Sequence, residues 1–281
     1  MTTKLVWNRY GKARVRLVKV ARAAGAHQLA DFTIDVQLEG DFESVYRGDN
    51  RLCLATDTMK NTVYVMAREP IAHAENFAER LAGHFIAQPA VTRARIGIAE
   101  HPWTRIAVGG RPHPHAFSQA GGEQWTAIVT RDASGTTIVS GLDNLVVLKT
   151  TDSAFSGFPR DQYTTLPETE DRILATSVTA TWTYRGGTTD FAARDRIRTA
   201  LVDAFAAHDS RSVQHTLAAM GEAALQACGD ILDITLTLPN RHHLLVNLEP
   251  FGLDNPNEIF VPTDQPYGLI EATIRREPNY G

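Results

Sequence analysis

Hydrophobic and polar residues alternate along three stretches of the chain. Apolar side chains occupy every second position of 32–38, 178–184 and 232–238, with Thr, Asp or Gln between them. Alternation with one polar face is typical of half-buried antiparallel strands. Weaker patterns predict further strands at 14–22, 92–99, 124–131, 136–140, 144–150, 243–248 and 268–276.

Four other segments have the three- and four-residue spacing of amphipathic helices. In the first pair, Met59, Val63 and Met66 share a face of a segment that starts near Thr56, and Phe77, Leu81 and Phe85 recur after a break at Glu69-Pro70. In the second pair, Asp190 is predicted to cap a helix that carries Phe191, Ile197, Leu201 and Phe205. Ser210 or Ser212 is predicted to cap a helix that carries Val213, Leu217, Met220 and Ala224.

The order of these elements repeats. Residues 56–108 and 190–248 each give two helices, an alternating strand and a polar corner, His101-Pro102-Trp103-Thr104-Arg105 and Pro239-Asn240-Arg241-His242-His243. We therefore predict an α+β fold of two similar domains, 1–138 and 139–281, each with an antiparallel sheet and a helix pair on one face. The Gly-, Pro- and His-rich stretch 109–123 is predicted to be a long loop.

Composition narrows the class of protein. The chain has 281 residues, a formal charge of −4 and 43% hydrophobic residues. This balance disfavours a nucleic-acid-binding protein, and the apolar runs are too short for a membrane span. The N-terminus carries no signal-peptide core, which predicts a cytoplasmic protein. Cys53 and Cys228 are expected to be buried, reduced thiols.

Candidate chemistry is sparse when motifs are taken singly. No nucleotide-binding loop and no paired-Cys or His-Glu-x-x-His metal motif is present. His113 and His115 are either loop histidines or part of a zinc or iron site. Thr56-Asp57 begins a predicted helix, where backbone N–H groups favour an anion, although the motif taken alone favours ordinary helix capping. Phe155 lies among small residues, where its ring could stack on a planar ligand or pack in an interface.

Several motifs in a fixed order give a much stronger signal. The run from Leu148-Lys149-Thr150-Thr151-Asp152-Ser153-Ala154-Phe155 through Tyr163-Thr164-Thr165-Leu166 to Asp171-Arg172 strongly resembles uricase, or urate oxidase, of the bacterial type. Other family motifs are Tyr10-Gly11-Lys12, Ala55-Thr56-Asp57, Pro112-His113-Pro114-His115, Ser212-Val213-Gln214, Pro239-Asn240-Arg241-His242 and Asn255-Pro256-Asn257-Glu258. The resemblance covers roughly residues 9–277.

The resemblance implies two tandem tunnelling-fold (T-fold) domains and a homotetramer with a central tunnel and active sites shared between subunits. It implies oxidation of urate by O2 and water to 5-hydroxyisourate and hydrogen peroxide, without a metal or an organic cofactor. The C-terminus, Asn279-Tyr280-Gly281, lacks a peroxisomal Ser-Lys-Leu signal, which again favours a cytoplasmic member.

The resemblance also assigns roles to individual residues. Lys12, Thr56 and His242 match the proton-relay residues of the family, and Asp57, Phe155, Arg172, Val213, Gln214 and Asn240 match the urate and oxygen site. Arg172 can grip a carbonyl oxygen and a ring nitrogen with two parallel N–H bonds.

Two alternatives stay open at this point. A metal-dependent pterin enzyme of the same fold would place zinc on His113 and His115. A catalytically inactive tetrameric binding protein would keep the purine pocket alone.

Overall fold

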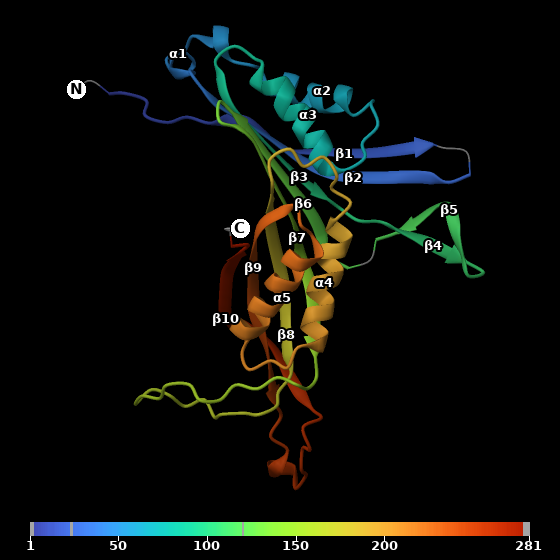
Figure 1. The fold of residues 1–281 in the computed structure, drawn as a ribbon, viewed down its shortest axis with the longest axis vertical. Helices are drawn as coiled ribbons and strands as arrows, with labels where there is room; N and C mark the ends of the chain where they lie inside the picture. The colour runs from blue at the N-terminus through green and yellow to red at the C-terminus, as the bar shows by residue number, and fades with distance from the viewer. Residues whose placement is uncertain (1–2, 23–24, 120, 278–281) are drawn as a thin grey trace. The chain divides into compact units, whose positions relative to one another are not determined.

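The computed structural model describes residues 3–22, 25–119 and 121–277. The chain divides into two compact units, residues 1–141 with 183–192 and residues 142–182 with 193–281 (Figure 1). Strands β7 (Gly135–Lys149) and β8 (Leu174–Tyr184) contribute residues to both units. The C-terminal tripeptide Asn279-Tyr280-Gly281 lies outside the described residues.

The strands of the first unit follow the order β1-β2-β3-β6-β7. They include β1 (Tyr10–Arg22), β2 (His27–Gly40), β3 (Val91–Glu100) and β6 (Gln124–Asp132), and the pairs β1–β2, β2–β3 and β3–β6 are antiparallel. On β2, Ile34, Val36 and Leu38 are buried and the residues between them are half-buried, which confirms the alternation read from the sequence. Strand β1 begins earlier than predicted, so that Lys12 lies within it.

Helices cover one face of these strands. A short helix α1 (Glu43–Tyr46) and a 3-10 turn η1 (Asn50–Leu52) precede α2 (Thr56–Met66) and α3 (Ala74–Ile86). Helix α2 packs on β1, and α3 packs on β3 and β6. Phe77, Leu81 and Phe85 of α3 are fully buried, so the four-residue repeat marks the core-facing side of the helix as predicted.

The second unit repeats this plan. Its strands follow the order β7-β8-β9-β10, and β9 (Ile231–Leu245) pairs antiparallel with β10 (Phe260–Arg275) after a short 3-10 turn η2 (Glu249–Phe251). Helices α4 (Arg194–Ala207) and α5 (Val213–Ala227) lie side by side, and α5 covers β9 and β10 (Figure 1). A Cβ on Gly221 would stand 2.6 Å from Cδ1 of Ile274, so glycine lets α5 approach β10 closely. The predicted α+β class with two helix pairs is confirmed.

Two predictions about the start of α4 were wrong. Asp190 does not cap α4, which begins at Arg194; its carboxylate instead accepts the N–H of Ala192 at 2.9 Å in a tight turn. Phe191 is buried in the first unit against His73 and Tyr184, which keeps this segment out of the helix.

The stretch 109–123 is not simply a loop. Strands β4 (Thr104–Val108) and β5 (Arg111–Ser118) pair as a hairpin. Gly109 and Gly110 both have positive φ, 58° and 76°, which the two-residue turn requires. The stretches 136–140 and 144–150 also form one strand, β7, rather than two.

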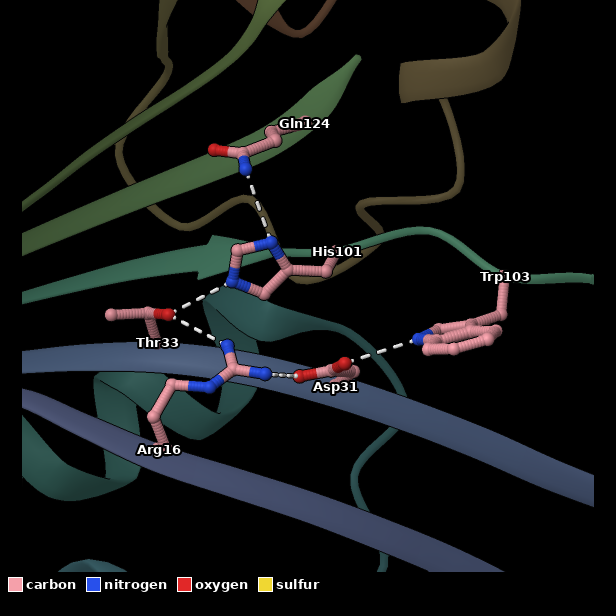
Figure 2. Close-up of polar contacts among 6 residues, drawn as sticks. All are labelled: Arg16, Asp31, Thr33, His101, Trp103 and Gln124. Carbon is pink, nitrogen blue, oxygen red and sulfur yellow. Dashed lines mark hydrogen bonds and ion pairs between the residues drawn. The ribbon is translucent and has the colours of Figure 1, made fainter. Parts of the chain in front are cut away.

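A polar network anchors the corner that begins at His101 (Figure 2). Arg16 pairs with the buried carboxylate of Asp31, which also accepts the indole N–H of Trp103 at 3.1 Å. The hydroxyl of Thr33 lies 2.8 Å from Nε2 of His101, and Gln124 lies 3.1 Å from Nδ1 of the same ring. Both ring nitrogens of His101 are therefore occupied by partners within the first unit.

None of the helices in the described ranges is long and apolar enough to cross a membrane.

Candidate active site

Lys12 lies on β1 next to a break in the strand pairing. It pairs with Val36, and the register shifts between Lys12 and Val15. At this bulge Arg14 adopts a φ of 55°, and its N–H donates to Oδ1 of Asp35 at 2.6 Å. Bulges of this kind re-aim a neighbouring side chain and are common beside active sites.

The bulge opens a small cavity in the first unit. Its volume is about 180 Å³, and its lining includes Tyr10, Gly11, Lys12 and Gln37. A Cβ on Gly11 would stand 1.8 Å from the carbonyl oxygen of Val36, so this position of the Tyr10-Gly11-Lys12 motif requires glycine.

Thr56 and Asp57 form the exposed first turn of α2. The helix cap, Ala55, has no side chain that can accept a hydrogen bond, and the first N–H groups of a helix have no partner within the helix. The Asp57 carboxylate accepts Lys60 Nζ at 2.5 Å and Asn61 Nδ2 at 2.9 Å.

The charge of Asp57 also relates this turn to Lys12. The pKa of Asp57 is lowered, chiefly by the hydrogen bond and the charge of Lys60, with a smaller contribution from the charge of Lys12. Lys12 and the start of α2 therefore lie within electrostatic reach of one another, in the same unit.

Arg172 and Phe155 meet in the second unit. The Arg172 guanidinium carbon lies 5.2 Å from the centroid of the Phe155 ring, which stacks on Phe158 at 4.9 Å. Burial lowers the pKa of Arg172. Within the described ranges, its buried Nε has no hydrogen-bond partner. A buried donor without an acceptor is costly, so the arrangement favours a ligand that supplies one.

Backbone hydrogen bonds join the loop that carries Phe155 to Ser210, and a hydroxyl bond joins Ser210 to α5. Ser153 pairs with Ser210, and the N–H of Ala154 donates to Ser210 O at 2.7 Å. Thr216 of α5 donates to the Ser210 hydroxyl at 2.7 Å, and all three hydroxyl residues are 1% exposed or less. The contacts fix the helix start against the segment that precedes Phe155.

At the start of α5, Ser212 is the cap, and its hydroxyl accepts the N–H of His215 at 3.1 Å. Ser212 was one of the two predicted caps. Val213 is buried behind it, while Gln214 is exposed on the first turn.

Asn240 and His242 form a separate pair on β9. Asn240 Nδ2 lies 3.5 Å from Nδ1 of His242, and Asn240 is almost fully buried. On β10 their partners are Gly268 and Thr263, with a register shift between the two.

The residues that the resemblance selected are divided between the two units. Lys12, Thr56 and Asp57 belong to the first unit, and Phe155, Arg172, Val213, Gln214, Asn240 and His242 belong to the second. Three contributors had no role assigned from the sequence: Asp35 at the bulge, Lys60 beside Asp57, and the Ser153–Ser210–Thr216 cluster. Gly11, which lies within β1, is a sequence signal for the bulge at which Asp35 lies. The i, i+3 spacing of opposite charges is a signal for the pairing of Lys60 with Asp57.

The other candidate residues lie elsewhere. His113 and His115 are on β5 with ring centroids 4.5 Å apart. The described ranges contain no group of three or more His, Cys, Asp or Glu residues placed to hold a metal ion. Cys228 is a buried free thiol, as expected, but Cys53 is only half-buried.

Comparison with known proteins shows the family. The sequence profile described as Uricase matches residues 8–130 and 138–271. The chain belongs to the uricase family. The resemblance read from the motifs is thereby confirmed.

Curated uricases match over nearly the whole chain. The uricase of Arthrobacter globiformis is 48% identical over 273 residues, which cover 96% of this chain and 89% of that protein. The uricase of Dictyostelium discoideum is 37% identical and covers 97% of both chains.

Solved uricase structures share the fold. The crystal structure of Arthrobacter globiformis uricase superimposes with a TM-score of 0.94 at 47% identity, covering 100% of this chain and 98% of that one. A uricase from Bacillus fastidious gives 0.83 at 24% identity, over 95% and 93% of the two chains, and supports the fold alone. The tandem α+β tunnelling fold is that of the solved uricases.

Proposed function

We propose that this chain oxidises urate with O2 and water to 5-hydroxyisourate and hydrogen peroxide, in purine degradation. The observation that carries the proposal is the half-buried guanidinium of Arg172 beside the ring of Phe155, whose buried Nε donor has no acceptor within the described ranges. A planar, electron-rich anion fits this pair, since it can stack on the ring and accept two parallel N–H bonds.

The other residues of the second unit complete the grip on the substrate. Gln214 offers an amide to the opposite edge of urate, and the Val213 N–H at the start of α5 donates to the anion. Asp57, from the first unit, is a carboxylate that can accept a ring N–H of urate.

The relay residues then move protons. Lys12 and Thr56 take a proton from bound urate, which makes it a better electron donor, and His242 completes the relay. Asn240 helps to place O2 or water. Urate loses two electrons and O2 gains them with two protons to become hydrogen peroxide, while the hydroxyl of water adds at C5. We propose that no metal and no organic cofactor takes part.

We also propose a homotetramer in which each active site is shared. Lys12, Thr56 and Asp57 lie in one unit and the substrate grip in the other. Strands β1 and β10 end the strand order, and exposed apolar side chains such as Val18 and Leu269 lie on them. Unpaired strand edges of this kind favour association between chains.

A complementation experiment tests the shared site. Thr56→Ala and Arg172→Ala chains should each be nearly inactive alone, and activity should return when the two are unfolded and refolded together. Well-formed mixed tetramers without activity would contradict a site shared between subunits.

Two further parts of the proposal concern organisation. We place the boundary between the tandem domains at 138/139, which the gap between the two profile matches, 130 to 138, supports. The cytoplasmic location stays a prediction.

The activity itself is tested by the loss of urate absorbance in the ultraviolet together with O2 uptake. After exhaustive chelation, urate and O2 should be consumed one to one. Activity that disappears with chelator and returns with zinc, iron or copper would instead support the metal-dependent alternative. Urate binding without O2 uptake would support the inactive binding protein.

A further inference from the structure

Tyr10 connects the strand that carries Lys12 to the segment that leads into α2. Its hydroxyl oxygen accepts the N–H of Leu54 at 2.9 Å. Tyr10 stands two residues before Lys12, and Leu54 stands two residues before Thr56. The Tyr10 hydroxyl therefore joins the two segments that carry the proposed relay pair.

The Tyr10 side chain is itself well fixed. Its ring packs edge-on against Phe42, with centroids 4.8 Å apart and planes at 89°, and Phe42 is 1% exposed. Burial raises the pKa of Tyr10, so the hydroxyl remains neutral throughout the physiological range.

The start of α2 has few other restraints from its own sequence. Ala55 gives no side-chain cap, and Thr56 and Asp57 are exposed. The segment between η1 and α2 has a backbone bond from Cys53 N to Asn50 O, which is local, whereas the bond to Tyr10 reaches the sheet.

We propose that Tyr10 is a positioning residue that holds Thr56 in register with Lys12 for proton transfer. The inference rests on the proposed urate oxidation. Tyr10 does not touch the substrate; it acts through Leu54 on the position of the helix start. A displacement of about 1 Å between reacting groups can lower a rate on the order of 100-fold, so a single hydrogen bond at this place has a large effect.

The test is Tyr10→Phe, which removes the hydroxyl and keeps the ring against Phe42. We expect kcat to fall about tenfold, as part of that misplacement penalty. The dissociation constant of urate, measured without O2, should stay within about twofold, because most of the proposed urate contacts, those of Arg172, Phe155 and Gln214, belong to the other unit and only that of Asp57 belongs to this one. The amide of Leu54 should exchange hydrogen faster than in the wild type.

Two control variants separate positioning from stability. Tyr64→Phe removes a hydroxyl from the exposed face of α2 and should leave kcat and exchange at Leu54 unchanged. Leu81→Ala creates a cavity in the core beneath α3 and should lower Tm while kcat stays near the wild-type value.

Wild-type kcat in Tyr10→Phe would overturn the inference, as would an equal loss of kcat in Leu81→Ala. If wild-type protein consumes no urate, the proposed function fails. Exchange at Leu54 still decides in that case whether the Tyr10 contact restrains the helix start.

Discussion

The two helix starts that carry site residues, those of α2 and α5, are built differently. Helix α5 begins with a serine cap, Ser212, and a buried Val213, and Thr216 in its first turns donates to the buried hydroxyl of Ser210. Helix α2 begins after Ala55, exposes its first turn and carries Asp57 there.

This difference suits two different tasks. The first turn of α5 contains no acidic residue. Its N–H groups and the positive end of its dipole can therefore bind an anion without competition from a carboxylate of the same turn. The α2 start already holds a carboxylate paired with Lys60, and its hydroxyl at Thr56 can pass a proton. We therefore expect the start of α5 to contribute to urate binding and Thr56, at the start of α2, to contribute to proton transfer.

The largest effect is expected where the grip is removed. Arg172→Lys keeps the charge but loses the planar guanidinium and its contact with the Phe155 ring. The fall in kcat/KM should correspond to a loss of about 2–4 kcal/mol of transition-state binding. Steady-state kinetics on urate provide the measurement.

Arg160→Lys is the matched control for this change. Arg160 also lies over an aromatic ring, 5.7 Å from the centroid of Phe158, but it is exposed and bonds to the carbonyl of Leu166. Its replacement should change kcat/KM less than twofold, roughly the scale of an exposed contact. Near-normal kinetics in Arg172→Lys would show that Arg172 is a structural charge.

A smaller effect, confined to kcat, is expected for Thr56→Ala. Removal of a group in a proton relay lowers the rate on the order of 100-fold, whereas urate affinity without O2 should hardly change. Thr56→Ser should restore most of the rate because the hydroxyl returns. Thr58→Ala, also exposed in α2, serves as the control. A large rise in the dissociation constant for urate would break the division between the two helix starts.

The contrast between the helix starts also shows what sequence can predict. Ser212 was among the predicted caps because capping depends on residues within one turn. Asp190 has the same local pattern, yet it does not cap a helix. Phe191 belongs to the first unit, and α4 begins only at Arg194, four residues after Asp190. Local patterns predicted the strands and helix faces, and packing over long distances overruled them where they failed.

The site depends more heavily on such distant contacts. The bond from Leu54 to Tyr10 joins residues 44 apart, and the Ser153–Ser210 pair joins two loops. Periodicity contains no information about either contact. The individual site residues were predicted from family motifs, and their roles stay predictions until the variants are measured.

Substitutions at the two cap residues should change the free energy of unfolding by about 1 kcal/mol or less. Ser212→Ala removes the hydroxyl that accepts the His215 N–H and should cost about that much free energy of unfolding, seen in denaturant titration. Ala55→Ser adds a hydroxyl at a residue whose φ and ψ, −59° and 135°, are non-helical, and it should stabilise the protein by less than this amount. Equal and opposite shifts would mean that the two starts differ only in the cap residue.

The smallest effect is expected at the ion pair of α2, and its sign depends on pH. Lys60 is the main cause of the lowered pKa of Asp57, so Lys60→Gln should raise that pKa toward its ordinary value. A carboxyl whose folded pKa is depressed stabilises the protein above its unfolded pKa and loses this contribution as pH falls through the folded one. The wild type should therefore have a slightly higher Tm than Lys60→Gln at neutral pH, and the difference should shrink as pH falls below the ordinary pKa of Asp and vanish below the lowered pKa of folded Asp57. Asp57 is exposed, which keeps the difference small.

Arg47→Gln, which breaks the exposed Arg47–Glu43 pair in α1, is the matched control and should leave the pKa of Asp57 unchanged in NMR titration. A Tm difference in Lys60→Gln that persists unchanged at low pH would show that Lys60 stabilises α2 through packing of its aliphatic chain rather than through the charge of Asp57.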